Sequence, residues 1–197
     1  MKKPSAPALH LSKFDVAERQ LTQALQLFFQ EQDPVSIHTL AEAAAQVLYD
    51  IGGAYGVKSI SRDNERIRPE KKKDWLSVLH SSRNFFKHAD RDKQAVHEFK
   101  DIFNDTSLLD AVNMYVTIKK RWTPETLMFY VWFGLNYPEL LLEDSDHYQI
   151  LAKLREGPYG PSPNDKAHFG QLAKLLRSGE LSMPNIAMYF GLVANDA

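Results

Sequence analysis

One short stretch of the sequence gathers the side chains best suited to acid–base chemistry on a phosphate. Residues 83–88 read Arg-Asn-Phe-Phe-Lys-His, and His80 stands three positions earlier. Arginine can clamp a phosphate with paired N–H donors, lysine adds a positive charge, and histidine exchanges protons near neutral pH. Cleavage of an RNA phosphodiester without a metal requires a proton acceptor, a proton donor and positive charge on the phosphoryl oxygens.

The spacing of these residues predicts one helix from about Pro69 to about His88, with two distinct faces. At about 100° per residue, the predicted core face holds Trp75, Val78, Leu79, Ser82, Phe85 and Phe86. The other face holds Arg83, Lys87, His80, Asn84 and His88, with no carboxylate among them. Arg83 and His88 are turned apart by about 140° and displaced by about 7.5 Å in a straight helix. Either the helix ends near His88, or each residue grips substrate beside its symmetry mate.

The stretch from Arg83 to His88 resembles the signature of HEPN domains. In that signature a polar residue follows the arginine directly, and four to six positions in all separate the arginine from the histidine. The resemblance covers about residues 13–137 and implies an all-α bundle that forms a homodimer with a composite, metal-independent RNase site. Carried over, Arg83 would stabilise phosphate charge, His88 would be the general acid or base, and Asn84 would orient one of them. Other HEPN-like proteins are inactive and serve as binding or assembly modules.

Several alternatives use the same region of the chain. Arg91, Asp92 and His97 repeat the arginine–polar–histidine spacing, although in a charged connector instead of an amphipathic helix. A metal site would have to join His80, His88, Asp90, Asp92, His97 and Glu98, but neither H-x-x-x-H nor H-E-x-x-H occurs, so no metal is expected. His38 could face the motif helix, and it is also expected to be a partly buried, hydrogen-bonded histidine.

A solvated helix face is the simplest alternative for Arg83, Lys87 and His88, because most charged helix faces carry no chemistry. The Lys71-Lys72-Lys73 run is likewise expected to be solvated surface more than a nucleic-acid patch. The Phe28-Phe29 and Phe85-Phe86 pairs could stack on bases, but their amphipathic placement favours core or dimer contacts.

The composition excludes several classes of protein. The chain has 197 residues, with 24 Lys plus Arg against 25 Asp plus Glu, so it is not a globally basic nucleic-acid binder. It has no cysteine, which excludes disulfides, thiolate metal sites and cysteine nucleophiles. The most apolar stretch, residues 127–142, is interrupted by Asn136, Pro138 and Glu139, short of the roughly 20 apolar residues that a membrane span requires. No targeting segment is visible, so a soluble cytoplasmic protein is expected.

Helical periodicity dominates the sequence and predicts an all-α fold, an antiparallel bundle of about five helices with a smaller C-terminal helical segment. Asp33-Pro34 and Thr123-Pro124 are typical helix starts, with a capping side chain followed by proline in the first turn. The five helices are expected at about 13–30, 34–52, 69–88, 107–120 and 124–137. Shorter helical stretches at 147–155, 168–176 and 184–192 complete the list. We therefore divide the chain into a HEPN-like bundle, residues 1–143, and an appendage packed on it, residues 144–197.

Two functional hypotheses from different classes follow. The first is a HEPN-like metal-independent endoribonuclease or RNA-binding protein with its site at a homodimer interface. Its catalytic residues would be Arg83, His88 and Asn84, with His80 and Lys87 binding substrate; it would need no cofactor and show no DNA specificity. The second is a non-catalytic module for dimerisation or protein interaction, with Phe29 and Val35 at the interface. A small-anion or nucleotide pocket around the same helix is a third possibility.

Overall fold

The computed structural model describes residues 8–63, 65, 67–90, 93–156, 162 and 164–182. These residues form eight α-helices and no β-strand, as the all-α prediction requires. The helices are α1 (Lys13–Phe29), α2 (Pro34–Gly52), α3 (Lys72–Leu79), α4 (Ser81–Lys87), α5 (Phe103–Lys119), α6 (Pro124–Asn136), α7 (Asp146–Glu156) and α8 (Lys166–Ser178). Three short 3₁₀ turns lie at Gly53–Tyr55, Pro69–Lys71 and Pro138–Leu140. The predicted stretch at 184–192 lies outside the described residues.

Side-chain caps set the starts of the main helices. The Ser12 hydroxyl accepts from the Asp15 N–H, and the Asp15 carboxylate accepts from the Ser12 N–H, which satisfies two otherwise unpaired donors at the start of α1. The Asp33 carboxylate accepts from the Ser36 N–H at 2.7 Å, and Thr123 caps α6 in a similar way. The two helix starts predicted from an acceptor followed by proline are therefore confirmed.

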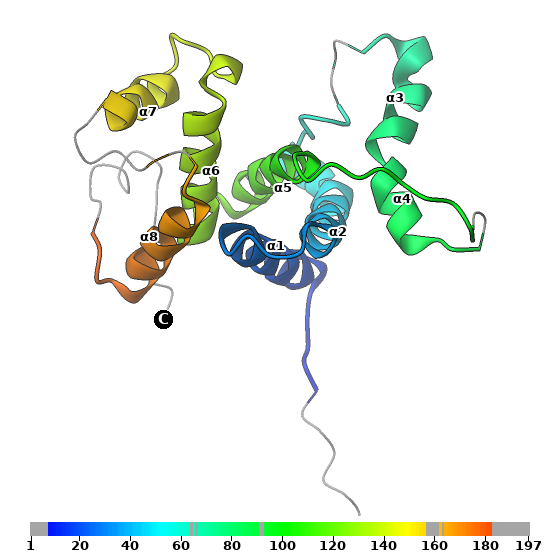
Figure 1. Ribbon diagram of the computed structural model, residues 1–197, viewed down its shortest axis with the longest axis horizontal. Coiled ribbons are helices and arrows are strands. Elements are labelled where there is room, and N and C mark those ends of the chain that lie inside the picture. Colours follow the sequence, from blue (N-terminus) through cyan, green and yellow to red (C-terminus); the bar gives the residue numbers. More distant parts are fainter. Residues whose placement is uncertain are drawn as a thin grey trace, which may run out of the picture.

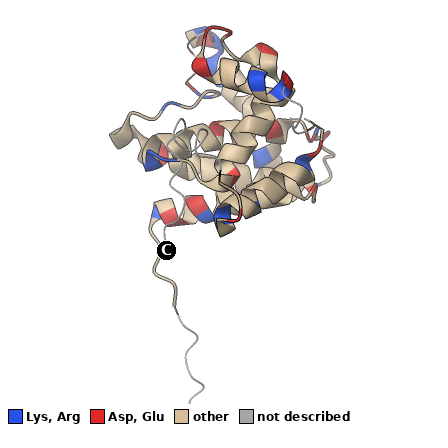
Figure 2. Cartoon of the chain, turned by 90° about the vertical axis from the view of Figure 1, so that its left-hand side faces the viewer, with Lys and Arg blue, Asp and Glu red and all other residues tan. Residues whose placement is uncertain are grey.

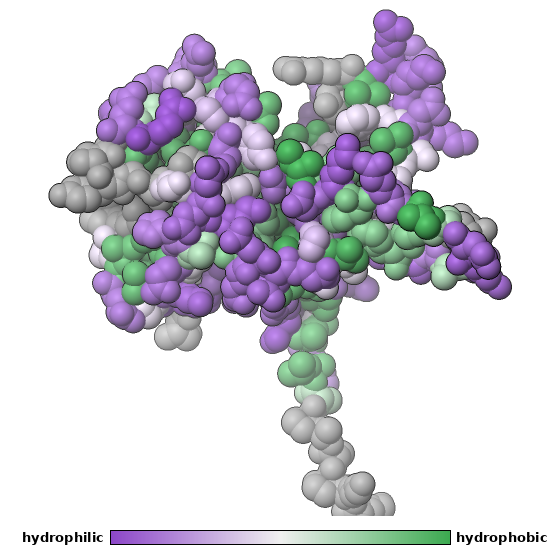
Figure 3. Space-filling view, viewed as in Figure 1, coloured by the Kyte–Doolittle hydropathy of each residue, from purple (hydrophilic) through white to green (hydrophobic). Residues whose placement is uncertain are grey.

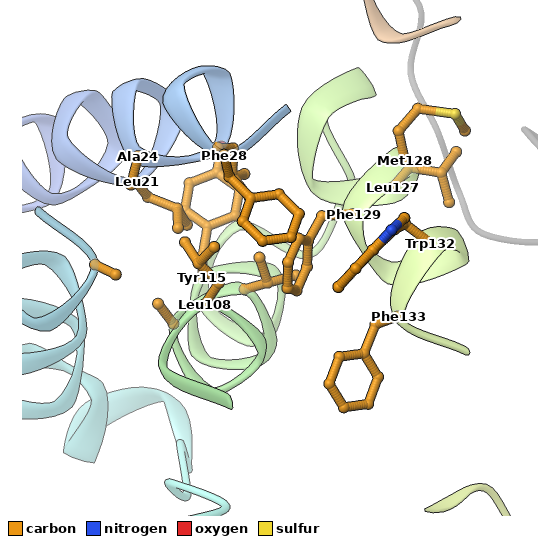
Figure 4. Close-up of a cluster of buried hydrophobic side chains, with 14 of the residues drawn as sticks. Leu21, Ala24, Phe28, Leu108, Tyr115, Leu127, Met128, Phe129, Trp132 and Phe133 are labelled. Carbon is orange, nitrogen blue, oxygen red and sulfur yellow. The ribbon is translucent and has the colours of Figure 1, made fainter. Parts of the chain in front are cut away.

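The core lies where α1, α2, α5 and α6 meet. α1 packs on α2, and α2 packs on α5; α6 contacts α1 and α5 from the other side (Figure 1). Figure 4 shows Phe28, Phe129 and Trp132 in one aromatic cluster, with the Phe28 ring meeting the Phe129 ring edge-on at 5.3 Å between centroids. α6 is buried nearly all round, which explains its continuous run of apolar residues.

The C-terminal helices add to this core from the side of α6. α8 packs on α6 and α1, and its Phe169 is fully buried among the residues of the same core. On this side of the molecule, basic and acidic residues are interspersed without a large patch of one sign (Figure 2). Arg177 of α8 binds both carboxylate oxygens of Glu125, a buried residue of α6. The division of the chain at residue 143 remains a prediction.

α8 approaches α1 closely because Gly170 has no side chain. A Cβ at Gly170 would lie 2.8 Å from the Phe29 Cβ, an atom that cannot move without shifting the α1 backbone. Gly170→Ala should therefore lower the free energy of unfolding by about 1–3 kcal/mol, measured by urea denaturation. Gly53→Ala is the matched control, because an added Cβ there meets nothing within 4 Å, and it should stabilise by about 0.4–1 kcal/mol. Equal effects at the two glycines would contradict the close packing of α1 and α8.

α3 and α4 stand apart from the four-helix core and form an arm, residues 69–90, on the opposite side from α7 and α8 (Figure 1). The prediction of a single helix at 69–88 is wrong, because the helix is interrupted at His80. The φ and ψ of His80 are −96° and 6°, and α3 ends just before it. The Ser81 hydroxyl donates to the Val78 carbonyl at the break, competing with the helical pattern as serine often does. The predicted core face is also partly wrong, because the Val78 side chain is 70% exposed. α5 begins at Phe103, four residues earlier than predicted.

Candidate functional site: the end of α4 and a buried polar cluster

The motif histidine lies at the end of the arm. α4 ends at Lys87, so His88 has an extended backbone, with φ and ψ of −125° and 108°. The His88 N–H still donates to the Asn84 carbonyl at 3.1 Å, which ties it to the last turn. The side chains of Asn84, Lys87 and His88 are all exposed. Of the two geometries considered from the sequence, the structure has the first, in which the helix ends next to the histidine.

Arg83 turns away from that surface and toward α2. Its guanidinium Nη1 donates to the Gln46 Oε1 at 2.9 Å and lies 3.9 Å from the Glu42 Oε2. The Arg83 side chain is only 14% exposed. A carboxylate therefore faces the motif arginine, although the polar arc of its own helix contains none.

Arg83 belongs to a group of buried and half-buried polar side chains that we call the α2 polar cluster. Its members are Glu42, Gln46, Arg62, Arg83 and Ser107. The Ser107 hydroxyl donates to Glu42 at 2.9 Å, and the Arg62 Nη1 donates to the same Gln46 oxygen that accepts from Arg83. Two guanidinium groups thus share one carbonyl oxygen, with one carboxylate beside them, so the cluster joins α2, α4, α5 and the turn at 59–63.

The turn that carries Arg62 is held by buried hydrogen bonds. Asp110 of α5 accepts from the Ser59 hydroxyl at 2.6 Å and from the Ile60 N–H at 2.8 Å. Burial raises the pKa of Asp110, while these two hydrogen bonds favour its charged form. The Trp75 indole N–H donates to the Ser61 carbonyl at 2.8 Å, which links α3 to this turn. The turn therefore positions both Arg62 and the base of the arm.

His80 occupies the break between α3 and α4 and is half-buried. Its Nε2 is buried and has no hydrogen-bond partner among the described residues. Burial, followed by the positive charges of Arg83 and Arg62, lowers the pKa of His80 to about 4. The imidazole is therefore neutral at pH 7, and its Nε2 cannot contact a phosphate without a movement of the ring.

His38 meets both expectations drawn from the sequence. It is 2% exposed, and its Nδ1 lies 3.1 Å from the Asn104 Oδ1. Its ring also contacts the ring of Phe86 on α4, with 5.7 Å between centroids. His97, the histidine of the second motif match, lies with its Nε2 2.8 Å from the Ser82 hydroxyl and its ring stacked on Phe85. Arg91 and Asp92 of that match lie outside the described residues.

The Glu42–Gln46–Arg62 part of the site was not identified from the sequence. Glu42 and Gln46 sit four residues apart on α2 among alanines that pack in the core. Polar residues at helical spacing beside a buried stripe are the signal that could have found them. Arg62 falls between the helices predicted at 34–52 and 69–88, and only the tertiary structure shows that it is buried and in contact with α2.

Other binding features lie away from α4. A cavity of about 590 Å³ opens between the end of α1 and α8, lined by four glutamines and Lys174, and no described residue of the arm lines it. Among the described residues, no three histidine or acidic side chains come together as a metal site. Every helix among the described residues is too short or too polar to serve as a membrane span. Phe29, considered as an interface residue, is 3% exposed and packs in the core, so that interpretation is wrong.

No family model, curated protein or solved structure matches this chain. Its function therefore has to be inferred from its own residues and their geometry.

Proposed function

We propose that this chain is a HEPN-like, metal-independent endoribonuclease or RNA-binding protein of the cytoplasm that acts as a homodimer. The observation that carries the proposal is the placement of His88 just beyond the end of α4, exposed beside Asn84 and Lys87. An imidazole in this position can approach a phosphodiester without a steric barrier from its own helix. Lys87 supplies positive charge next to it.

The chemistry of cleavage gives a reason for two copies of this chain to act together. In transesterification, the ribose 2′-oxygen attacks phosphorus and the bond to the 5′-oxygen breaks. One group must take the 2′-hydroxyl proton, and another must give a proton to the departing 5′-oxygen. Two His88 imidazoles from facing arms would supply both groups, with no metal required.

The contacts of Arg83 assign it a different role from the one the family signature implies. Its guanidinium is bound to Gln46 and lies beside Glu42, so it fixes the orientation of α4 and leaves phosphate contact to Lys87 and His88. Arg83 is thus a positioning residue in this proposal, and Asn84 supports His88 from the adjacent turn of the helix.

His88→Ala should lower the rate of RNA cleavage by at least about 100-fold with the fold intact, because it removes the general acid and base. The measurement is cleavage of end-labelled single-stranded RNA in the presence of a metal chelator, with circular dichroism as the check on folding. His168→Ala is the matched control, since His168 is an exposed histidine on α8. Cleavage at the wild-type rate in His88→Ala, or no cleavage by the wild-type protein, would overturn the nuclease assignment.

A non-catalytic dimerisation or protein-interaction module is the second candidate, and specific observations favour it. Arg83 is already occupied, and the region beside the arm exposes apolar side chains. Val96 is 97% exposed, Ile102 53%, Phe103 46% and Val35 40%. Figure 3 shows hydrophobic residues over α4 and the following segment, while the outer end of the arm is hydrophilic. A stable dimer by light scattering that loses mass in Phe103→Glu, together with no RNA cleavage, would support this candidate.

A further inference from the structure

His38 is enclosed where the arm rests on the bundle. The Phe99 ring, from the segment 93–102 that follows the arm, lies 4.9 Å from the His38 ring, and the Phe86 ring of α4 lies 5.7 Å away. Both rings are steeply inclined to the imidazole, with angles of 84° for Phe86 and 61° for Phe99 between the ring planes, and His38 is almost completely shielded from water. A positive charge on this ring would therefore be placed among apolar groups.

The hydrogen bonds of Asn104 determine which His38 nitrogen carries the proton. The Asn104 Nδ2 donates to the Pro34 carbonyl at 3.0 Å, so its Oδ1 is the atom that faces His38. An oxygen can only accept, which requires the His38 Nδ1 to be the donor. A charged His38 would therefore carry its second proton on Nε2, which is buried and has no acceptor among the described residues.

The charged groups around His38 come from three elements. Glu42 lies one turn further along α2 and favours a charged imidazole, but it already accepts from Ser107 and lies beside Arg83. Arg83 on α4 and His97 on the segment 93–102 oppose a charge on His38. Burial has the largest effect, and the pKa of His38 is lowered.

A second neutral imidazole lies in the same interface. His80, at the base of α4, has a buried Nε2 with no partner among the described residues. Burial, Arg83 and Arg62 oppose its charging, while Glu42 favours it. Both histidines can therefore gain a proton favourably only if α4 moves away from α2. The four-helix core of α1, α2, α5 and α6 does not depend on either ring for its aromatic packing.

We infer that this interface is a pH-sensitive latch: in mildly acidic solution, protonation of His38 and His80 releases α4 and the segment 93–102 from α2 while the helical core stays folded. Release exposes Phe86 and Phe99 and frees Arg83 from Gln46. This consequence rests on the proposed function: where the arm carries the nuclease site, the latch controls the position of that site.

The direction of the pH dependence follows from proton binding. The ordinary pKa of histidine is about 6.5, and the latched form binds the proton less well than the open form. Above pH 6.5 both rings are neutral and the latch is fully stable. As the pH falls below 6.5, the open form takes up more protons, so the opening equilibrium constant rises by up to about tenfold per pH unit for each histidine. For His80 this window extends down to about pH 4.

Hydrogen exchange followed by mass spectrometry tests the latch in the full chain without any RNA. Protection factors, corrected for the intrinsic pH dependence of exchange, should fall at least about tenfold for residues 72–88 between pH 7 and pH 5. Those of α5 and α6 should change by less than about threefold. Arm protection that is independent of pH, or a loss of core protection in parallel with the arm, would overturn the inference.

Variants separate the latch from general acid sensitivity. His80→Gln, at a partly exposed position, and the double variant His38→Gln/His80→Gln should each reduce the pH dependence of arm protection, and the double variant should nearly abolish it. His168→Gln should retain the wild-type pH dependence. A double variant whose arm opens over the wild-type pH range would show that these histidines are not the latch. Because no RNA is present, this result is independent of the nuclease assay.

Discussion

Glu42→Ala should lower the free energy of unfolding by about 3–5 kcal/mol, because it leaves buried positive charge without its carboxylate. Glu42 is 6% exposed and is the acidic member of a cluster with Arg62 and Arg83, of which Arg62 is also 6% exposed. The substitution removes the attraction to Arg83 at 3.9 Å and the acceptor for the Ser107 hydroxyl. Urea denaturation at pH 7 measures the change.

A double-mutant cycle shows whether the effect of Glu42 comes from its pairing. Arg83→Ala in the Glu42→Ala background should cost less than Arg83→Ala alone, with a coupling of about 0.5–3 kcal/mol. Glu98→Ala is the control for an exposed ion pair: its carboxylate lies 3.6 Å from the Lys100 ammonium, but its side chain is 83% exposed, so its loss should change stability by at most about 1 kcal/mol. A cost below about 1 kcal/mol for Glu42→Ala would contradict the inference that the cluster fastens the arm to α2.

Phe129→Ala should lower the free energy of unfolding by about 3–5 kcal/mol, because it leaves a cavity at the centre of the molecule. Phe129 is fully buried, and its ring contacts Phe28 of α1 and Trp132 of α6, with 5.3 and 5.6 Å between centroids. The four core helices are too tightly packed around this ring to close the gap fully.

Two other apolar substitutions serve as controls for the loss of stability expected in Phe129→Ala. Val78→Ala removes apolar atoms from a residue that is 70% exposed, and it should change stability by no more than about 0.5 kcal/mol. Phe129→Leu should fall between the two, since it keeps part of the buried volume. An effect of Phe129→Ala below about 1 kcal/mol would mean that α1 and α6 do not share one core.

Local sequence signals were sufficient for the helices of the core. Asp33 and Thr123, each followed by proline, mark the starts of α2 and α6 within one residue, because capping depends on atoms three residues apart along the chain. The apolar residues of α1 and of the largely apolar α6 are also buried, as helical periodicity predicts. The single helix predicted at 69–88 was wrong because the apolar periodicity continues across His80, whereas the helical conformation of the backbone is interrupted there.

The candidate site was predicted only in part. The exposed positions of Asn84, Lys87 and His88 agree with a polar face on the motif helix. The orientation of Arg83 was not predictable, because its partners Glu42 and Gln46 lie 41 and 37 positions away along the chain. The same holds for His80, whose neutral state at pH 7 depends on burial and on two arginines from different elements.

By itself, the sequence determined the helical class of this protein, the starts of α1, α2 and α6 and the absence of cysteine chemistry. These properties depend on residue types and on spacing within a few turns, which the order of residues specifies directly. Only the tertiary structure decided which polar side chains lie together, that Arg83 faces a carboxylate, and that the Nε2 atoms of His38 and His80 are buried without a partner among the described residues. Such properties arise from desolvation and from charges on distant segments, and both exist only after the chain has packed.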